Sequence, residues 1–217
     1  MKLIKQVVVL LTLTLFTTFT AFGEDGVYEK AMAKAIETLY TTKQVDELIP
    51  VANQFNLIAR KETSQWLPLY YEALSYLWLA GRSKNAAKQS GYLNQAQAVL
   101  DKAQTLKPND SELVTLQGYL YMITVASDPA TYGPTLAGKA IGTLQKAHQL
   151  NPENPRAMLL LGQMQIGTAQ YMGGSTTEPC ELVAKSRSFF AKEQGQTDLM
   201  PRWGQSMVGK VIEGCGR

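Results

Sequence analysis

Few residues in this chain have the types and spacing that catalysis or metal binding requires. The only histidine, His148, has no cysteine near it in the sequence, and the two cysteines, Cys180 and Cys215, lie far apart. Such spacing gives neither a metal-ligand motif nor a pair of base and nucleophile. Gly173-Gly174-Ser175 lacks the lysine that follows a phosphate-binding loop. The sequence therefore predicts no catalytic residue, no metal site, no cofactor and no enzymatic activity.

Aromatic side chains are the remaining candidates for binding. They gather between residues 66 and 78 and again at Tyr119 and Tyr121. Packing in the core accounts for many aromatic residues, but a tyrosine, with its apolar ring and polar tip, also suits a contact surface. The choice between these roles depends on the elements that carry the rings.

An internal repeat indicates what those elements are. Residues 102–110 read KAQTLKPND and residues 146–154 read KAHQLNPEN, an offset of 44 that also relates Gly118 to Gly162. A repeat of this length is typical of stacked helix pairs that bury their apolar faces on one another. The apolar spacing predicts helices at about 26–41 and 46–61, 64–80 and 91–107, 111–126 and 135–150, 155–171 and 179–194, and a final helix at 201–214.

These segments resemble the tetratricopeptide repeat (TPR), a helix-turn-helix pattern of about 34 residues. Ahead of the closing proline, Pro108, the chain has Ala96, Leu100 and Ala103 at the small, bulky and small positions of a second helix, and Gly118 at the small position of the next first helix. The resemblance implies an all-α fold: a right-handed α-α superhelix of about four helix pairs with a C-terminal capping helix. The longer repeat departs from the TPR pattern by about ten residues.

The first 23 residues differ from the rest of the chain. Lys2 and Lys5 precede an apolar run that ends in Ala21-Phe22-Gly23, which is the pattern of a cleaved secretory signal peptide. The alternative is a permanent membrane anchor, but the run is shorter than the ~20 residues that span a bilayer. We expect a signal peptide at 1–23 and a single domain at 24–217, periplasmic or secreted, without a lipid anchor or a stable membrane span.

Two further expectations concern the mature chain. Without residues 1–23 it carries 19 basic and 18 acidic side chains, so a nucleic-acid partner is not indicated. An oxidising compartment favours a disulfide between Cys180 and Cys215, provided that the helices carrying them pack antiparallel. The alternative is two separate buried thiols.

The C-terminal part also resembles small exported TPR proteins of Gram-negative bacteria, through its Met-Gly-Gly loop at 172–174 and its Pro-x-Trp-Gly motif at 201–204. In TPR proteins the first helices line a concave groove. Carried over by register, the resemblance implies that a partner is bound by residues on three successive first helices: Tyr71, Glu112, Thr115, Tyr119, Arg156 and Gln163.

The leading hypothesis is a non-catalytic scaffold of the bacterial cell envelope that binds another envelope protein, as a peptide or helix, in this groove. The alternative is a small-molecule carrier or an enzyme with an apolar cavity between helices. A third possibility is self-association through an uncapped face. A deep pocket would favour the carrier, and an open groove would favour the scaffold. Three expected breaks within helix pairs, at 81–91, 127–134 and 172–178, mark one edge of the array as a second possible binding surface or as merely tolerated loops.

Overall fold

The computed structural model describes residues 25–193 and 199–215, and within these ranges the chain forms helices and no strand. The predicted signal peptide at 1–23 lies outside the described residues. In order along the chain the helices are α2 (Asp25–Thr41), α3 (Leu48–Lys61), α4 (Leu67–Arg82), α5 (Ala86–Leu106), α6 (Ser111–Ser127), α7 (Pro129–Leu150), α8 (Pro155–Met172), α9 (Thr177–Lys192) and α10 (Gln205–Glu213).

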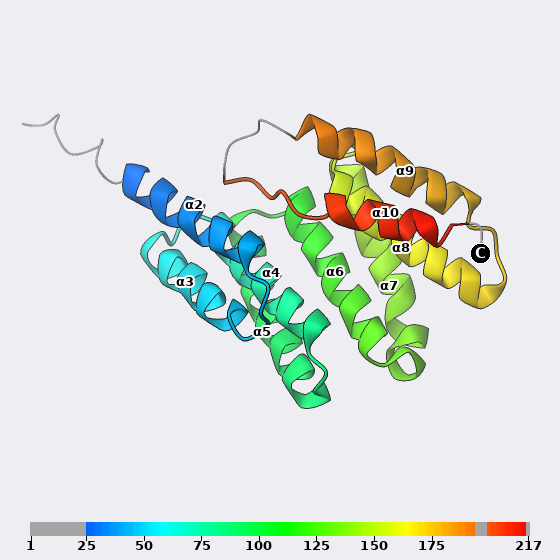
Figure 1. Cartoon of the computed structure of the whole chain (residues 1–217), viewed down its shortest axis with the longest axis horizontal. Coiled ribbons are helices and arrows are strands. Elements are labelled where there is room, and N and C mark those ends of the chain that lie inside the picture. Colours follow the sequence, from blue (N-terminus) through cyan, green and yellow to red (C-terminus); the bar gives the residue numbers. More distant parts are fainter. Residues whose placement is uncertain (1–24, 194–198, 216–217) are drawn as a thin grey trace, which may run out of the picture.

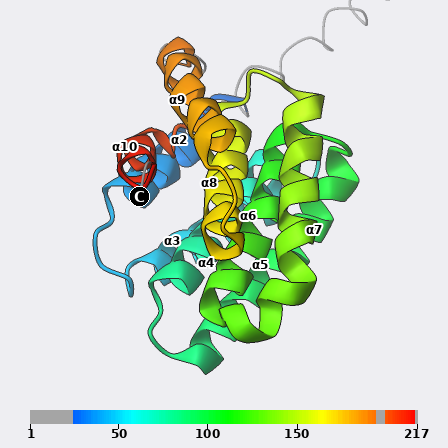
Figure 2. The same cartoon turned by 90° about the vertical axis from the view of Figure 1, so that its right-hand side faces the viewer.

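The first eight of these helices form four antiparallel pairs that stack side by side (Figure 1). Each first helix packs on its own second helix and on the next pair, and α4, α6 and α8 also contact one another in sequence. Figure 2 shows α7 and α10 on opposite sides of α6 and α8. The predicted all-α, TPR-like solenoid of four helix pairs with a C-terminal helix is confirmed.

The small residues of the repeat lie where helices approach most closely. A Cβ atom on Gly118 would lie 2.5 Å from Leu144, and one on Gly162 would lie 2.5 Å from Val183. Leu144 and the alanines on either side of it in the pattern are fully buried. The side chain that packs against each glycine therefore belongs to the second helix of the same pair, as the TPR pattern requires.

Two of the three long breaks expected within helix pairs, 81–91 and 127–134, are wrong, and the third, 172–178, is present but shorter. The joins are only residues 83–85, Asp128 and residues 173–176. Asn85 caps α5 by accepting from the Lys88 N–H at 2.9 Å, and the Asp128 side chain caps α7 by accepting from Thr131. These caps start the second helices early, and α7 tolerates Pro134 in its interior at the loss of one backbone hydrogen bond. The hypothesis of a binding edge made of long loops loses its basis.

The final helix also begins later than predicted. Residues 201–203 are not helical, and α10 starts at Gln205, directly after Gly204. Gly204 has a φ of 107°, a conformation that residues with a Cβ rarely adopt. We call residues 199–204 the C-terminal strap, because they run as a non-helical segment across the first helices before α10 begins (Figure 1).

The helices that the structure describes are too short or too polar to cross a membrane. Within residues 25–193 and 199–215, none combines the length and the apolar character that a span across a bilayer needs.

Candidate functional site

The C-terminal strap lies on the face formed by the first helices. The Tyr71 hydroxyl on α4 donates to the Leu199 carbonyl at 2.8 Å, and the Arg202 N–H donates to the Tyr40 hydroxyl on α2 at 3.0 Å. The Trp203 ring stacks on Tyr119 of α6, with centroids 5.4 Å apart. Three successive first helices thus bind the end of their own chain.

Beneath the strap a buried polar network joins α4, α6, α8 and α9. The Trp203 indole N–H donates to the Tyr70 hydroxyl at 2.8 Å, and this hydroxyl donates to Glu112 at 3.0 Å. Arg156 binds Glu112 through both Nε and Nη2 and binds Glu193 through Nη1 at 2.8 Å. Because each charge has a partner of opposite sign, the network can remain buried.

Arg156 is the centre of this network and is only 2% exposed. Burial alone would lower its pKa, but the Glu112 charge and the hydrogen bonds that Arg156 donates to both carboxylates outweigh burial and raise the pKa well above its usual value. Burial raises the pKa of Glu193, and the hydrogen bond from Arg156 offsets part of this rise. Arg156 therefore remains a cation, and its role in this structure is to hold the helices and the strap together.

The residues assigned to an open groove are placed differently by the structure. Four of them, Tyr71, Glu112, Thr115 and Arg156, are buried, and Tyr119 is half-buried under Trp203. The structure brings Glu112 and Arg156 together as an ion pair, whereas the Thr115 hydroxyl donates to the Ser111 carbonyl within its own helix. Gln163 is half-buried, and its Oε1 has no hydrogen-bond partner among the described residues. Partner binding by this set stays a prediction, and it requires the strap to leave.

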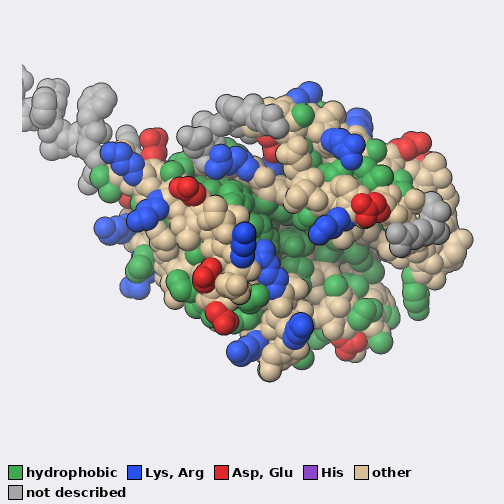
Figure 3. Space-filling view, in the orientation of Figure 1, with side chains coloured by type: hydrophobic (Ala, Val, Ile, Leu, Met, Phe, Trp, Pro, Cys, Tyr) green, Lys and Arg blue, Asp and Glu red, His purple; other side chains and the backbone are tan. Residues whose placement is uncertain are grey.

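Beside the strap the same face contains a pocket of about 790 Å³. Its volume lies in the range of small-molecule sites, which is about 300–1,000 Å³. Figure 3 shows an apolar hollow in the middle of this face with basic side chains near its edge. The lining comes from α2, α4, α6, the strap and α10: Tyr40, Trp78, Gly81, Arg82, Tyr119, Arg202, Trp203, Gly204, Gln205, Ser206 and Met207.

Two pairs of aromatic rings form the walls of this pocket. The rings of Tyr40 and Trp78 lie 6.1 Å apart, and the rings of Tyr119 and Trp203 stack on each other. Burial raises the pKa of Tyr40, although its hydrogen bond from Arg202 opposes the shift. Burial also raises the pKa of Tyr119. Both phenols are therefore neutral at pH 7, and the walls offer flat apolar surface rather than charge.

The chain's usual metal-binding side chains lie elsewhere. His148 is on α7, and both cysteines form a disulfide, so neither residue type lines the pocket. Of the lining side chains, only Met207 and the two neutral tyrosines could approach a metal. No cluster of His, Cys, Asp and Glu suited to a metal ion occurs among the residues that the structure describes.

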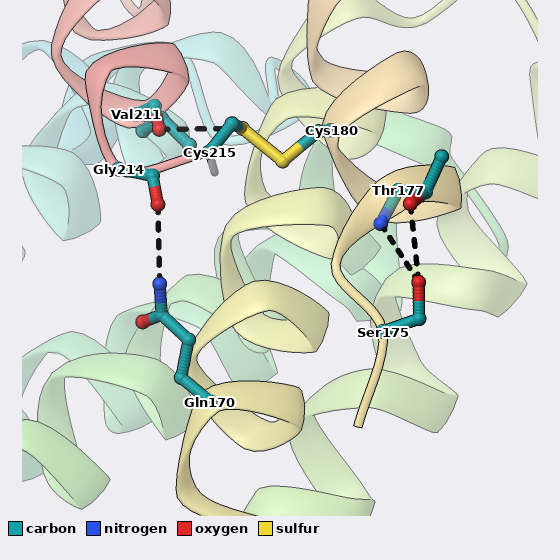
Figure 4. Close-up of a disulfide and its surroundings, with 7 residues drawn as sticks. All are labelled: Gln170, Ser175, Thr177, Cys180, Val211, Gly214 and Cys215. Atoms are coloured by element: carbon teal, nitrogen blue, oxygen red, sulfur yellow. Dashed lines mark hydrogen bonds between the residues drawn. A yellow bond between two sulfur atoms is a disulfide. The ribbon is translucent and has the colours of Figure 1, made fainter. Parts of the chain in front are cut away.

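A disulfide fixes the helix that closes one side of the pocket. Cys180 in the first turn of α9 is bonded to Cys215, just after α10, with Cα atoms 6.0 Å apart (Figure 4). The Gln170 side chain donates to the Gly214 carbonyl at 3.1 Å and ties the same end of α10 to α8. The predicted pairing of the two cysteines is confirmed.

Several pocket residues were not identified from the sequence as binding residues. The predicted helices at 26–41 and 201–214 include Tyr40 and Trp203, but no sequence pattern marks either residue as part of a pocket. Arg82 and Arg202 showed no pattern at all. The one available signal was Pro201, which precedes Trp203 and disfavours continuation of a helix from upstream.

The fold and the pocket together define the class of this chain: a TPR-like helical-repeat protein with an aromatic pocket beside its own C-terminal strap. It is similar to the HusA haemophore from Porphyromonas gingivalis, with 25% sequence identity and a TM-score of 0.79, over 90% of this chain and 96% of the haemophore. A TPR protein from Thermus thermophilus shares 16% identity, with a TM-score of 0.49, over 87% of this chain and 92% of that one.

Two other comparisons gave no match. No family model matches the chain, and no curated protein sequence matches it.

Proposed function

We propose that this protein is a non-catalytic carrier that binds a planar, largely apolar ligand of the haem type in the aromatic pocket. The observation that carries the proposal is the cavity of about 790 Å³, whose lining includes the ring pairs Tyr40–Trp78 and Tyr119–Trp203. Aromatic walls favour flat ligands because rings stack with large contact area. The similar protein from P. gingivalis, over nearly the whole chain, is a haemophore.

The pocket's own residues would hold such a ligand mainly by its ring. Haem-binding proteins that ligate iron use histidine, cysteine, methionine or tyrosine. Here the lining supplies only Met207 and two tyrosines whose pKa values are raised by burial. Ring stacking and exclusion of water then provide most of the affinity, and Met207 is the side chain best suited to approach the metal.

We further propose residues 1–23 as a signal peptide, residues 24–217 as one domain, and a periplasmic or secreted location. The disulfide between Cys180 and Cys215 supports an oxidising compartment.

The second candidate function is capture of an envelope protein or peptide on the first-helix face. It is favoured by one observation: this face already binds a non-helical segment, the strap, through Tyr71 and Tyr119. A partner would use the predicted set around these residues after displacing the strap.

The first test is titration of the protein with haem, followed by the haem absorption band and by quenching of tryptophan fluorescence. Trp78→Ala removes one wall and should weaken binding at least tenfold, because such an anchor contributes about 2 kcal/mol. Trp66→Ala is the matched control, because Trp66 is the N-cap residue of α4, the helix that carries Trp78, and does not line the pocket. If the wild type does not bind haem, or both variants bind equally well, the carrier proposal is wrong.

A further inference from the structure

The pocket has two arginines at its edge that form no ion pair with an acidic side chain among the residues that the structure describes. Arg82 is in the last turn of α4, and Arg202 is in the strap, so residues far apart in the sequence line one cavity. Both side chains are exposed, and no Asp or Glu is among the described residues that line the pocket. Among the described residues neither guanidinium takes part in a salt bridge or a side-chain hydrogen bond, unlike the buried Arg156.

Each arginine lies over one ring of the same aromatic wall. The Arg82 Cζ is 5.4 Å from the Trp78 ring centroid, and the Arg202 Cζ is 6.0 Å from the Tyr40 ring centroid. The two rings are themselves 6.1 Å apart. Stacking on a ring restrains a guanidinium while its N–H donors stay free. The pair is therefore positioned beside the flat surface on which a ligand would rest.

We propose that Arg82 and Arg202 determine specificity by binding two acidic groups on one edge of the ligand. This inference rests on the proposed carrier function and narrows its ligand class to planar aromatic dicarboxylates. The apolar edge of the ring then points toward Trp203 and Met207, and the carboxylates stay at the mouth. Guanidinium and carboxylate form paired, charge-assisted hydrogen bonds, so a neutral ligand of the same shape loses them.

The test compares haem with its dimethyl ester, which has the same ring without the two charges, in one buffer with a small fraction of organic cosolvent. The variants are Arg82→Gln, Arg202→Gln and the double variant, which shorten an exposed side chain and leave the buried core unchanged. Lys210→Gln is the matched control, because Lys210 is an exposed cation on α10 outside the pocket lining. Circular dichroism checks that all of them fold.

Each single variant should weaken haem binding about fivefold to tenfold and leave binding of the ester unchanged, because only haem carries the charges that the arginines recognise. Lys210→Gln should bind both ligands as the wild type does. The inference is overturned if the wild type binds haem and the ester equally well, or if the arginine variants weaken both ligands to the same extent. In either case binding of the ring itself is retained, so the carrier proposal stands. If the wild type binds neither haem nor the ester, the carrier proposal itself is overturned.

Discussion

At the scale of single residues, two glycines of α8 differ in whether a neighbouring helix packs against them. On α8, a Cβ atom added to Gly162 would meet Val183 at 2.5 Å and the Pro179 carbonyl oxygen at 2.8 Å, whereas one added to Gly167 would meet nothing within 4 Å. A side chain can rotate away, but the carbonyl belongs to the backbone of α9 and cannot move alone. Two glycines in one helix therefore have opposite roles.

Gly162→Ala should lower the free energy of unfolding by about 1–3 kcal/mol, because the methyl group overpacks the contact between α8 and α9. Gly167→Ala should raise it by about 0.5–1 kcal/mol, because alanine favours the helix and has room. Urea denaturation followed by circular dichroism measures both changes. Equal effects in the two variants would contradict the close approach of α8 and α9.

The sequence predicted some of these residues and not others for a physical reason. Gly118, Gly162 and Leu144 belong to the internal repeat, and their contacts join neighbouring helices. The repeat pattern therefore predicts these residues. Trp203 and Arg202 contact Tyr70 and Tyr40, which lie 133 and 162 residues earlier in the chain. No local pattern encodes contacts over such separations, so the pocket and the strap could not be predicted.

At the scale of elements, the disulfide and α10 form one functional unit. The helix contributes Gln205, Ser206 and Met207 to the pocket, and its far end is bonded to α9. Val208 is the only buried residue of α10, so the packing contacts that hold this helix cover a small area.

The sequence predicted the positions of the helices well, because apolar spacing is a local pattern. It did not predict the loop lengths, because the caps at Asn85 and Asp128 start their helices despite the Gly and Pro residues nearby.

Replacing both cysteines, Cys180→Ala with Cys215→Ala, should lower the free energy of unfolding by roughly 3–4 kcal/mol in the chain-entropy model. It should also speed release of a bound ligand, because α10 then holds its side of the pocket through noncovalent contacts alone. Thermal denaturation and stopped-flow dissociation of haem measure the two effects. A variant that is less stable but releases haem at the wild-type rate would show that the disulfide does not act on the pocket.

At the scale of the whole molecule, the strap joins parts of the solenoid that are not neighbours. In a simple repeat array each pair contacts only the next one, and its stability is a sum of local terms. Here Arg202 binds Tyr40 on α2, while Trp203 binds α4, α6 and, through its carbonyl, Arg156 on α8. One short segment thus couples all four helix pairs, and we expect a single cooperative unfolding transition.

Trp203→Ala should break this coupling and lower the free energy of unfolding by about 3–5 kcal/mol, as is usual for a large aromatic residue that is only 5% exposed. Hydrogen exchange should then become faster in α2 and α3 than in α8 and α9. Leu57→Ala is the control, because Leu57 is 62% exposed on α3 and should change stability little. Uniform exchange across all pairs in Trp203→Ala would contradict the proposed coupling.

The strap also has a consequence for the time course of folding. Helix pairs made of local contacts form quickly, whereas a contact between Arg202 and Tyr40 must close a very long loop. The strap residues that complete the pocket come after all four helix pairs in the sequence. They can therefore dock only after the helices that they contact are in place. The stacked array should therefore form first, and the pocket should become complete in the slowest step.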